Sequence, residues 1–176
     1  LPLSICKEIT NESSVYIGLC IQTWNGSTEI GNVYSSITAN VPSSAKPSIS
    51  FKLSDKNGYS SIYGGYIQNN SILHVESSAS AKNEATVKTI TVKAKVNGST
   101  STYYGSSVDI SLPYTGTWTI SVTATDSRGK STTAATQTIT VLAYSPPTIT
   151  ELSARRTDAS GNATSNGSYL QVIFSV

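Results

Sequence analysis

The sequence has little of what most catalytic sites require. Its 176 residues include one histidine and two cysteines, and only 12% of them are charged. The histidine, His74, has no nucleophile, base partner or orienting group in a recognisable motif, so we expect no catalytic triad. Nothing in the sequence nominates the facing pair of carboxylates that a glycosidase needs. The sequence therefore predicts that the protein is not an enzyme.

The two cysteines, Cys6 and Cys20, lack the CxxC spacing of a zinc or redox site. We expect free thiols, because Cys20 falls within an alternating strand and Cys6 in a loop; a disulfide across neighbouring strands is the alternative. No metal site and no cofactor are predicted. The alternative here is calcium at a joint between modules, where Asp126 and Asp158 would contribute oxygen ligands.

Charge and hydropathy argue against further classes. A formal net charge of +2 gives little reason to expect nucleic-acid binding. No apolar run approaches the roughly 20 residues of a membrane-spanning helix, and no secretion signal opens the chain. Methionine is absent and the chain begins Leu1-Pro2-Leu3, so we expect an internal piece of a longer polypeptide.

The clearest pattern that is present lies between residues 116 and 142. Apolar residues such as Trp118 and Ile120 alternate with Ser and Thr, which predicts one strand face in a core and the other in water. The turn that follows runs from Asp126 to Gly129. Asp can bond to its own backbone there, and Gly accepts a positive φ. The stretch therefore predicts two strands joined by a tight turn.

A similar hairpin occurs near the start of the chain. An alternating strand over residues 14–23 leads into Asn25-Gly26, a strong hairpin signal. This pattern returns in the later hairpin about 100 residues further on, which is the length of an immunoglobulin-like module. The phrase Pro47-Ser-Ile-Ser likewise returns as Pro147-Thr-Ile-Thr. Both comparisons indicate an internal repeat of one module.

The repeat and the frequent turn signals predict an all-β fold of tandem immunoglobulin-like β-sandwich modules, one complete and two partial. The expected divisions are the carboxy-terminal part of a module at 1–45, a complete sandwich at 46–145 and the amino-terminal part of a further module at 146–176. Linkers rich in Pro and Ser, at 42–47 and 144–147, mark the boundaries. A partial module cannot bury a full core. Its missing part is expected outside this sequence, or complementary ends meet within or between chains.

Within the complete module we expect short strands and one long loop. The strands before the central hairpin are predicted at residues 47–54, 71–80, 87–96, 99–104 and 107–112. Residues 55–65, which are rich in Gly, Ser and Tyr, are predicted to form the loop. Trp118 is predicted in the core, because it alternates in phase with Ile120 and Val122.

Tyrosines provide the candidate binding residues. Three of them, Tyr59, Tyr63 and Tyr66, fall in or next to the Gly-rich loop, and Tyr103 and Tyr104 fall in a hairpin. Exposed tyrosine rings can stack on sugars or anchor a protein interface. The alternative is that these rings pack against the end of the sandwich or against the next module.

The carboxy-terminal part of the chain resembles a known family at residue level. A closing Thr- and Val-rich strand leads into a junction whose elements are Tyr144, Pro147, Ala154, Arg156 and Gly167-Ser168-Tyr169. This junction, together with the TATDSRGK turn, is similar to minor structural proteins in the tails of siphophages that infect Gram-positive bacteria. Arg155 departs from the pattern, which often has a single Arg at this point.

The resemblance implies a non-enzymatic structural component of a phage tail that acts as a spacer or decoration. Contact with host cell-wall polysaccharide through the tyrosines is left open. The expected location is the virion tail, and the expected partners are other tail proteins or copies of the chain, with no nucleic acid and no membrane insertion. The alternatives are a bacterial cell-surface adhesin or stalk module, and a non-catalytic carbohydrate-binding module of a secreted glycosidase.

Overall fold

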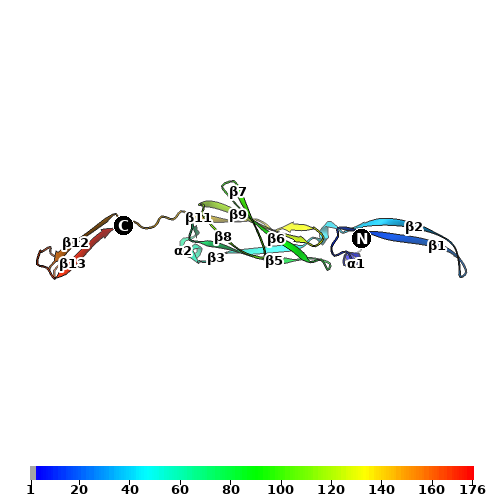
Figure 1. Ribbon diagram of the computed structural model, residues 1–176, viewed down its shortest axis with the longest axis horizontal. Helices are drawn as coiled ribbons and strands as arrows, with labels where there is room; N and C mark the ends of the chain where they lie inside the picture. The colour runs from blue at the N-terminus through cyan, green and yellow to red at the C-terminus, as the bar shows by residue number, and fades with distance from the viewer. Residues whose placement is uncertain (1–2) are drawn as a thin grey trace. The chain divides into compact units, whose positions relative to one another are not determined.

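The computed structural model describes residues 3–176, which form strands almost throughout (Figure 1). Contacts divide the chain into two units, Leu1–Ala143 and Tyr144–Val176. The all-β expectation is confirmed. The predicted boundary near residue 145 lies close to the division between the units, whereas the predicted boundary at residue 45 lies inside the first unit.

Two sheets pack face to face in the first unit. The smaller sheet has the strand order β3 (Ser48–Asp55), β5 (Ile72–Ser80) and β8 (Ser107–Ser111). The larger sheet has the order β4 (Tyr66–Ile67), β11 (Gln137–Leu142), β9 (Gly116–Asp126), β6 (Val87–Val96) and β7 (Ser99–Tyr104), with β10 (Ser131–Thr133) also paired to β9. All pairings are antiparallel except that of β4 with β11.

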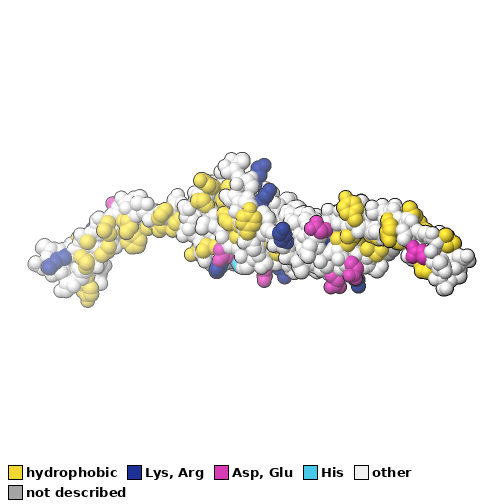
Figure 2. All heavy atoms as spheres, turned by 45° about the vertical axis from the view of Figure 1, so that its right-hand side comes forward, with side chains coloured by type: hydrophobic (Ala, Val, Ile, Leu, Met, Phe, Trp, Pro, Cys, Tyr) yellow, Lys and Arg dark blue, Asp and Glu magenta, His cyan; other side chains and the backbone are white. Residues whose placement is uncertain are grey.

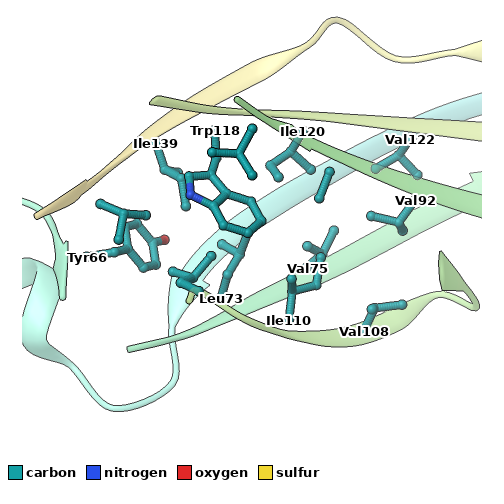
Figure 3. Packing of buried hydrophobic residues seen from close by; sticks show 14 of the residues in the cluster. Tyr66, Leu73, Val75, Val92, Val108, Ile110, Trp118, Ile120, Val122 and Ile139 are labelled. Atoms are coloured by element: carbon teal, nitrogen blue, oxygen red, sulfur yellow. The ribbon is translucent and has the colours of Figure 1, made fainter. Parts of the chain in front are cut away.

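Side chains that alternate along the strands of both sheets form one core (Figure 3). Leu73 and Val75 on β5 are fully buried, and Ile120 and Val122 on β9 face them from the other sheet. Trp118 is 4% exposed and donates from Nε1 to the carbonyl oxygen of Tyr114 at 2.9 Å. The predicted alternation of the central hairpin, and the core position of Trp118, are confirmed.

Turn chemistry sets the limits of the strands. Asn97 and Gly98 have φ of 48° and 80°, as a tight hairpin turn requires, and β6 and β7 end and begin on either side of them. The strand after the central turn differs from the prediction. It is interrupted between β10 and β11, where the pairing with β9 shifts register.

The amino-terminal part of the first unit contains a short helix and a long hairpin. Its elements are α1 (Leu3–Cys6), β1 (Ser14–Asn25), β2 (Thr28–Asn40) and the short 3-10 helix η1 (Ser43–Ala45). A small second core forms at the base of this hairpin from Cys6, Ile9, Val41 and Ala45. Cys6 is therefore in a helix and buried, not in a loop, and both it and the exposed Cys20 are free thiols.

The hairpin β1–β2 exposes the apolar side chains that its alternation was expected to place on a core face. Leu19 and Ile21 are 42% and 64% exposed, because β1 pairs only with β2 and no sheet lies opposite within the described residues. The second unit is the hairpin of β12 (Glu151–Thr157) and β13 (Tyr169–Ser175), whose apolar side chains are exposed in the same way. Figure 2 shows apolar surface over both hairpins.

Candidate functional site

The predicted loop at 55–65 contains a short helix, α2 (Tyr59–Tyr63), which was not expected. Gly58 and Gly64 flank it with φ of 79° and 72°, a conformation that favours glycine. The side chain of Asp55 fixes the start of the helix: Oδ2 accepts a hydrogen bond from Ser60 N at 2.9 Å and another from Ser71 Oγ at 2.7 Å. The loop is therefore a preformed surface attached to the end of β3.

Two of the five candidate tyrosines lie together on this helix. The ring centroids of Tyr59 and Tyr63 are 6.4 Å apart and the rings are tilted by 37°. Tyr63 is 60% exposed and its neighbour Ile62 is 70% exposed, whereas Tyr59 is half-buried. An exposed ring beside an exposed aliphatic side chain can contact the apolar face of a sugar or a protein partner.

Tyr66 is separated from this surface, because its ring points into the core (Figure 3). It is 8% exposed and belongs to the core cluster with Trp118. Burial raises the pKa of the Tyr66 phenol, and the charge of Asp55 raises it further. Tyr66 therefore lies in the core, on the strand β4 that pairs with β11.

The remaining two tyrosines lie on β7, at the opposite edge of the larger sheet from β4. Tyr104 is 71% exposed, and Tyr103 is partly buried against the core. The five candidates are therefore not one site. The structure brings together Tyr59 and Tyr63, places Tyr66 in the core and leaves Tyr104 on a separate surface.

The smaller sheet carries a charged row that sequence reasoning did not identify. His74 Nδ1 lies 2.7 Å from Asp109 Oδ1, and Lys56 Nζ donates to Asp109 Oδ2 at 2.5 Å. The hydrogen bond from Lys56, and then the one from His74, lower the pKa of the Asp109 carboxyl. Nothing in the sequence spacing links these residues, because Lys56 follows the end of β3, His74 lies on β5 and Asp109 lies on β8.

A serine, Ser54, lies next to this row, so its residue types can be compared with those of a Ser-His-Asp catalytic triad. Cross-strand pairing places Ser54 opposite His74 on one side, and Asp109 opposite His74 on the other. However, no hydrogen bond joins Ser54 to His74 in the described structure, and Asp109 is shared with Lys56. The row therefore has the contacts of a surface ion-pair network.

The residues considered for calcium are used differently. Asp126 is fully buried in the turn after β9, where Oδ1 accepts hydrogen bonds from the backbone of Arg128 and Lys130 at 3.0 and 2.8 Å. Asp158 caps a turn of the second unit by accepting from Ser160 N and Asn162 N, both at 2.9 Å. These hydrogen bonds, led by those from Asn162, lower the pKa of Asp158. Across residues 3–176, no group of three or more His, Cys, Asp or Glu side chains could hold a metal ion.

Residues 1–168 match a family described as "Siphovirus protein of unknown function (DUF859)", and the chain belongs to this family. The resemblance to siphophage proteins is thereby confirmed. No curated protein matches the chain. In the part of the chain that the structure describes, no helix has the length and apolar character needed to span a membrane.

Proposed function

We propose that the chain is a non-enzymatic spacer in the siphophage tail, built from immunoglobulin-like modules in series. The order of strands supports the module type. The first, second and fifth strands of an immunoglobulin-like sandwich share one sheet, and its third, sixth and seventh strands share the other. In this chain β3, β5 and β8 form one sheet, and β6, β9 and β11 belong to the other.

The observation that carries the spacer role is the succession of strand units along a chain of siphovirus origin. A sandwich with one closed core is followed by a Pro-Pro segment at Pro146 and Pro147 and then by a second hairpin whose opening sequence repeats that of the sandwich. Serial modules of this type extend a chain without needing a ligand. The family match supports a place in a virion, and the tail is our inference from the resemblance at the junction.

Electron microscopy of the phage that encodes the chain tests this role. Antibodies raised against the purified chain and labelled with gold should bind along the tail of intact virions. Antibodies absorbed beforehand with the purified chain provide the control and should leave the tail unlabelled. Labelling confined to the capsid, or none on intact or mildly disrupted particles, would contradict the proposal.

Contact with host cell-wall polysaccharide is a second candidate function, which the exposed helix α2 favours. The side chains of Ile62 and Tyr63 face solvent on a loop that Asp55 holds in place. Such a preformed apolar surface loses little conformational freedom on binding a sugar ring. The partly buried Tyr59 packs beside Tyr63 and supports its ring.

A matched pair of variants tests this contact on immobilised wall polysaccharide from host cells. Tyr63→Ala together with Ile62→Ser should abolish retention. Tyr104→Ala removes another exposed ring, at the far edge of the larger sheet, and should leave retention unchanged. Tyr66 is kept in both proteins, because its loss would disturb the core. Equal retention of both variants, or none by the unmodified chain, would exclude this site.

A further inference from the structure

The turn between β9 and β10 buries an arginine against the amino-terminal segment of the same unit. Arg128 is only 5% exposed. Its Nε donates to the carbonyl oxygen of Ile9 at 2.6 Å, and its Nη2 donates to that of Cys6 at 3.1 Å. Nη2 also donates to the carbonyl oxygen of Asn83, in the loop between β5 and β6. One side chain therefore connects three main-chain segments.

The turn is built to aim this side chain. Asp126, fully buried, accepts hydrogen bonds from the backbone nitrogens of Arg128 and Lys130, and Gly129 completes the turn with a φ of 78°. Ser127 adds a neighbouring contact, since its hydroxyl donates to the carbonyl oxygen of Thr10. The conformation of the turn thus directs the guanidinium group toward the amino-terminal segment.

The other side of the contact offers carbonyl groups that need partners. Cys6 is the last residue of α1, and the carbonyl groups of a final helical turn have no partner within the helix. The small core of Cys6, Ile9, Val41 and Ala45 holds this segment at the base of the β1–β2 hairpin. The surface presented to Arg128 is therefore a set of main-chain acceptors, with no side chain involved in the recognition.

Energetics argue that this contact fixes an orientation more than it adds stability. Among the described residues, Arg128 has no carboxylate within salt-bridge distance, and its Nη1 has no hydrogen-bond partner. A buried charge without a counter-charge is costly, and apolar packing would stabilise the same site better. A guanidinium, however, presents five donors in a rigid planar fork. It can hold several carbonyl groups in one geometry, which an apolar side chain cannot.

We propose that the end of the sandwich formed by residues 81–86 and 126–130 is a docking surface for the carbonyl-bearing base of the preceding strand pair. Arg128 is the residue that locks the two in one orientation. The biological role of this contact rests on the proposed spacer function, because a spacer holds its neighbours at a fixed distance only if its joints are stiff. The cation of this joint is a side chain of the protein, so the joint needs no calcium.

The two native cysteines test this interface directly. Cys6 is fully buried in the small core next to the docking surface, and its carbonyl oxygen accepts from Arg128, whereas Cys20 is exposed on β1. Thiol reactivity depends on access as well as on the thiolate fraction. In the unmodified chain, a thiol reagent should therefore modify Cys20 quickly and Cys6 slowly. Arg128→Ala should raise the rate at Cys6 at least about tenfold by opening this interface, and leave the rate at Cys20 unchanged.

Two further variants keep the result interpretable. Arg128→Lys retains the charge but not the fork, so it should also expose Cys6 and serves if the alanine variant fails to fold. Arg156→Ala removes an exposed arginine from the second unit and should change neither rate. The near-ultraviolet circular dichroism of the buried Trp118 shows whether the sandwich itself stays folded. Unchanged protection of Cys6 in a folded Arg128→Lys protein would overturn the proposal.

A distance measurement addresses the orientation itself. Spin labels are attached to Cys20 on β1 and to a cysteine introduced by Ser101→Cys on β7, in a Cys6→Ser background that keeps the main-chain carbonyl. The distribution of distances should be narrow with Arg128 and several times broader with Arg128→Lys, with or without EDTA. An equally broad distribution in both proteins, or narrowing that requires calcium, would overturn the stiff joint. Neither result depends on where the chain lies in the virion, so it stays separate from the electron-microscopy test.

Discussion

The strand β9 and the strand β1 have the same kind of sequence but different surroundings. On β9, Val122 and Ala124 are fully buried between two sheets, whereas on β1 the corresponding Leu19 and Ile21 are 42% and 64% exposed. The difference arises because β9 faces the smaller sheet and β1 pairs only with β2. Alternation therefore predicts a strand and the face that should be buried, but burial itself depends on a second sheet.

The repeated opening phrase gives a closer comparison. Ile49 follows Pro47 and packs against the core of the sandwich, while Ile149 follows Pro147 and is 60% exposed. The residue and its local sequence are nearly identical in the two places. The free energy that this isoleucine contributes must therefore differ, because the hydrophobic effect depends on the area removed from water.

The two tryptophans provide the largest expected contrast. Trp118→Ala should destabilise the sandwich by about 3–5 kcal/mol, because it leaves a cavity in the core and removes a hydrogen bond. Trp24 is 52% exposed on β1, and Trp24→Ala should change the free energy of unfolding by less than about 0.5 kcal/mol. Urea denaturation followed by far-ultraviolet circular dichroism measures both. A large loss for Trp24→Ala would show that the β1–β2 face is covered in solution.

The two aspartate turns give the next contrast. Asp126→Ala should cost about 1–3 kcal/mol, because it leaves two backbone N–H groups of a buried turn without acceptors. Asp158→Ala removes the same kind of contact from an exposed turn in the second unit, where water replaces it, so the loss should be smaller. Hydrogen exchange at Arg128 and Lys130, compared with Ser160 and Asn162, reports the two effects separately. Equal loss of protection in the two turns would contradict the role given to burial.

Alkaline titration compares the buried Tyr66 with the other tyrosines of the chain. The pKa of Tyr66 is raised by burial and by Asp55, so the folded state favours the protonated phenol. The resulting stabilisation is present below about pH 10 and is lost as the pH rises through the higher pKa of the folded state. Tyr66→Phe should remove the last step of the tyrosinate absorbance curve and reduce the loss of stability above pH 10. If that step persists in the variant, another tyrosine is responsible for it.

The surface row of Lys56, His74 and Asp109 should give the smallest effect. Its partners lower the pKa of Asp109, so the carboxylate stabilises the folded state above the pKa of the unfolded chain, about 3.9. This contribution is lost as the pH falls through the lower pKa of the folded state. Asp109→Asn should therefore be slightly less stable than the unmodified chain at pH 6, and the difference should vanish near pH 2. A difference that persists at pH 2 would point to a steric cause.

Much of the strand pattern could be predicted from the sequence, because local chemistry fixes it. The strands Val87–Val96 and Ser99–Tyr104 have the predicted bounds, since Asn97-Gly98 leaves the chain little choice of turn. The helix α2 was missed. Five residues carry too little periodicity to show a helix, and this one depends on Asp55 and on the two flanking glycines.

The candidate site was predicted less well, for a related reason. The Gly-rich sequence grouped Tyr66 with Tyr59 and Tyr63, but pairing of β4 with β11 turns Tyr66 into the core. Arg128 gave no signal at all beyond its place in a turn. Its partners are main-chain carbonyl groups of residues distant in the sequence. Every residue has such a group, so no residue type in the sequence marks the partners of Arg128.

The two edges of the larger sheet affect whether another chain can pair with the sandwich. At one edge β4 has only two residues, and at the other β7 consists of Ser, Thr and Tyr, with the charged Lys93 and Lys95 on the adjoining β6. Short or polar edges are poor templates for the addition of a foreign strand. Copies of the sandwich that meet at these edges are therefore not expected to join their sheets.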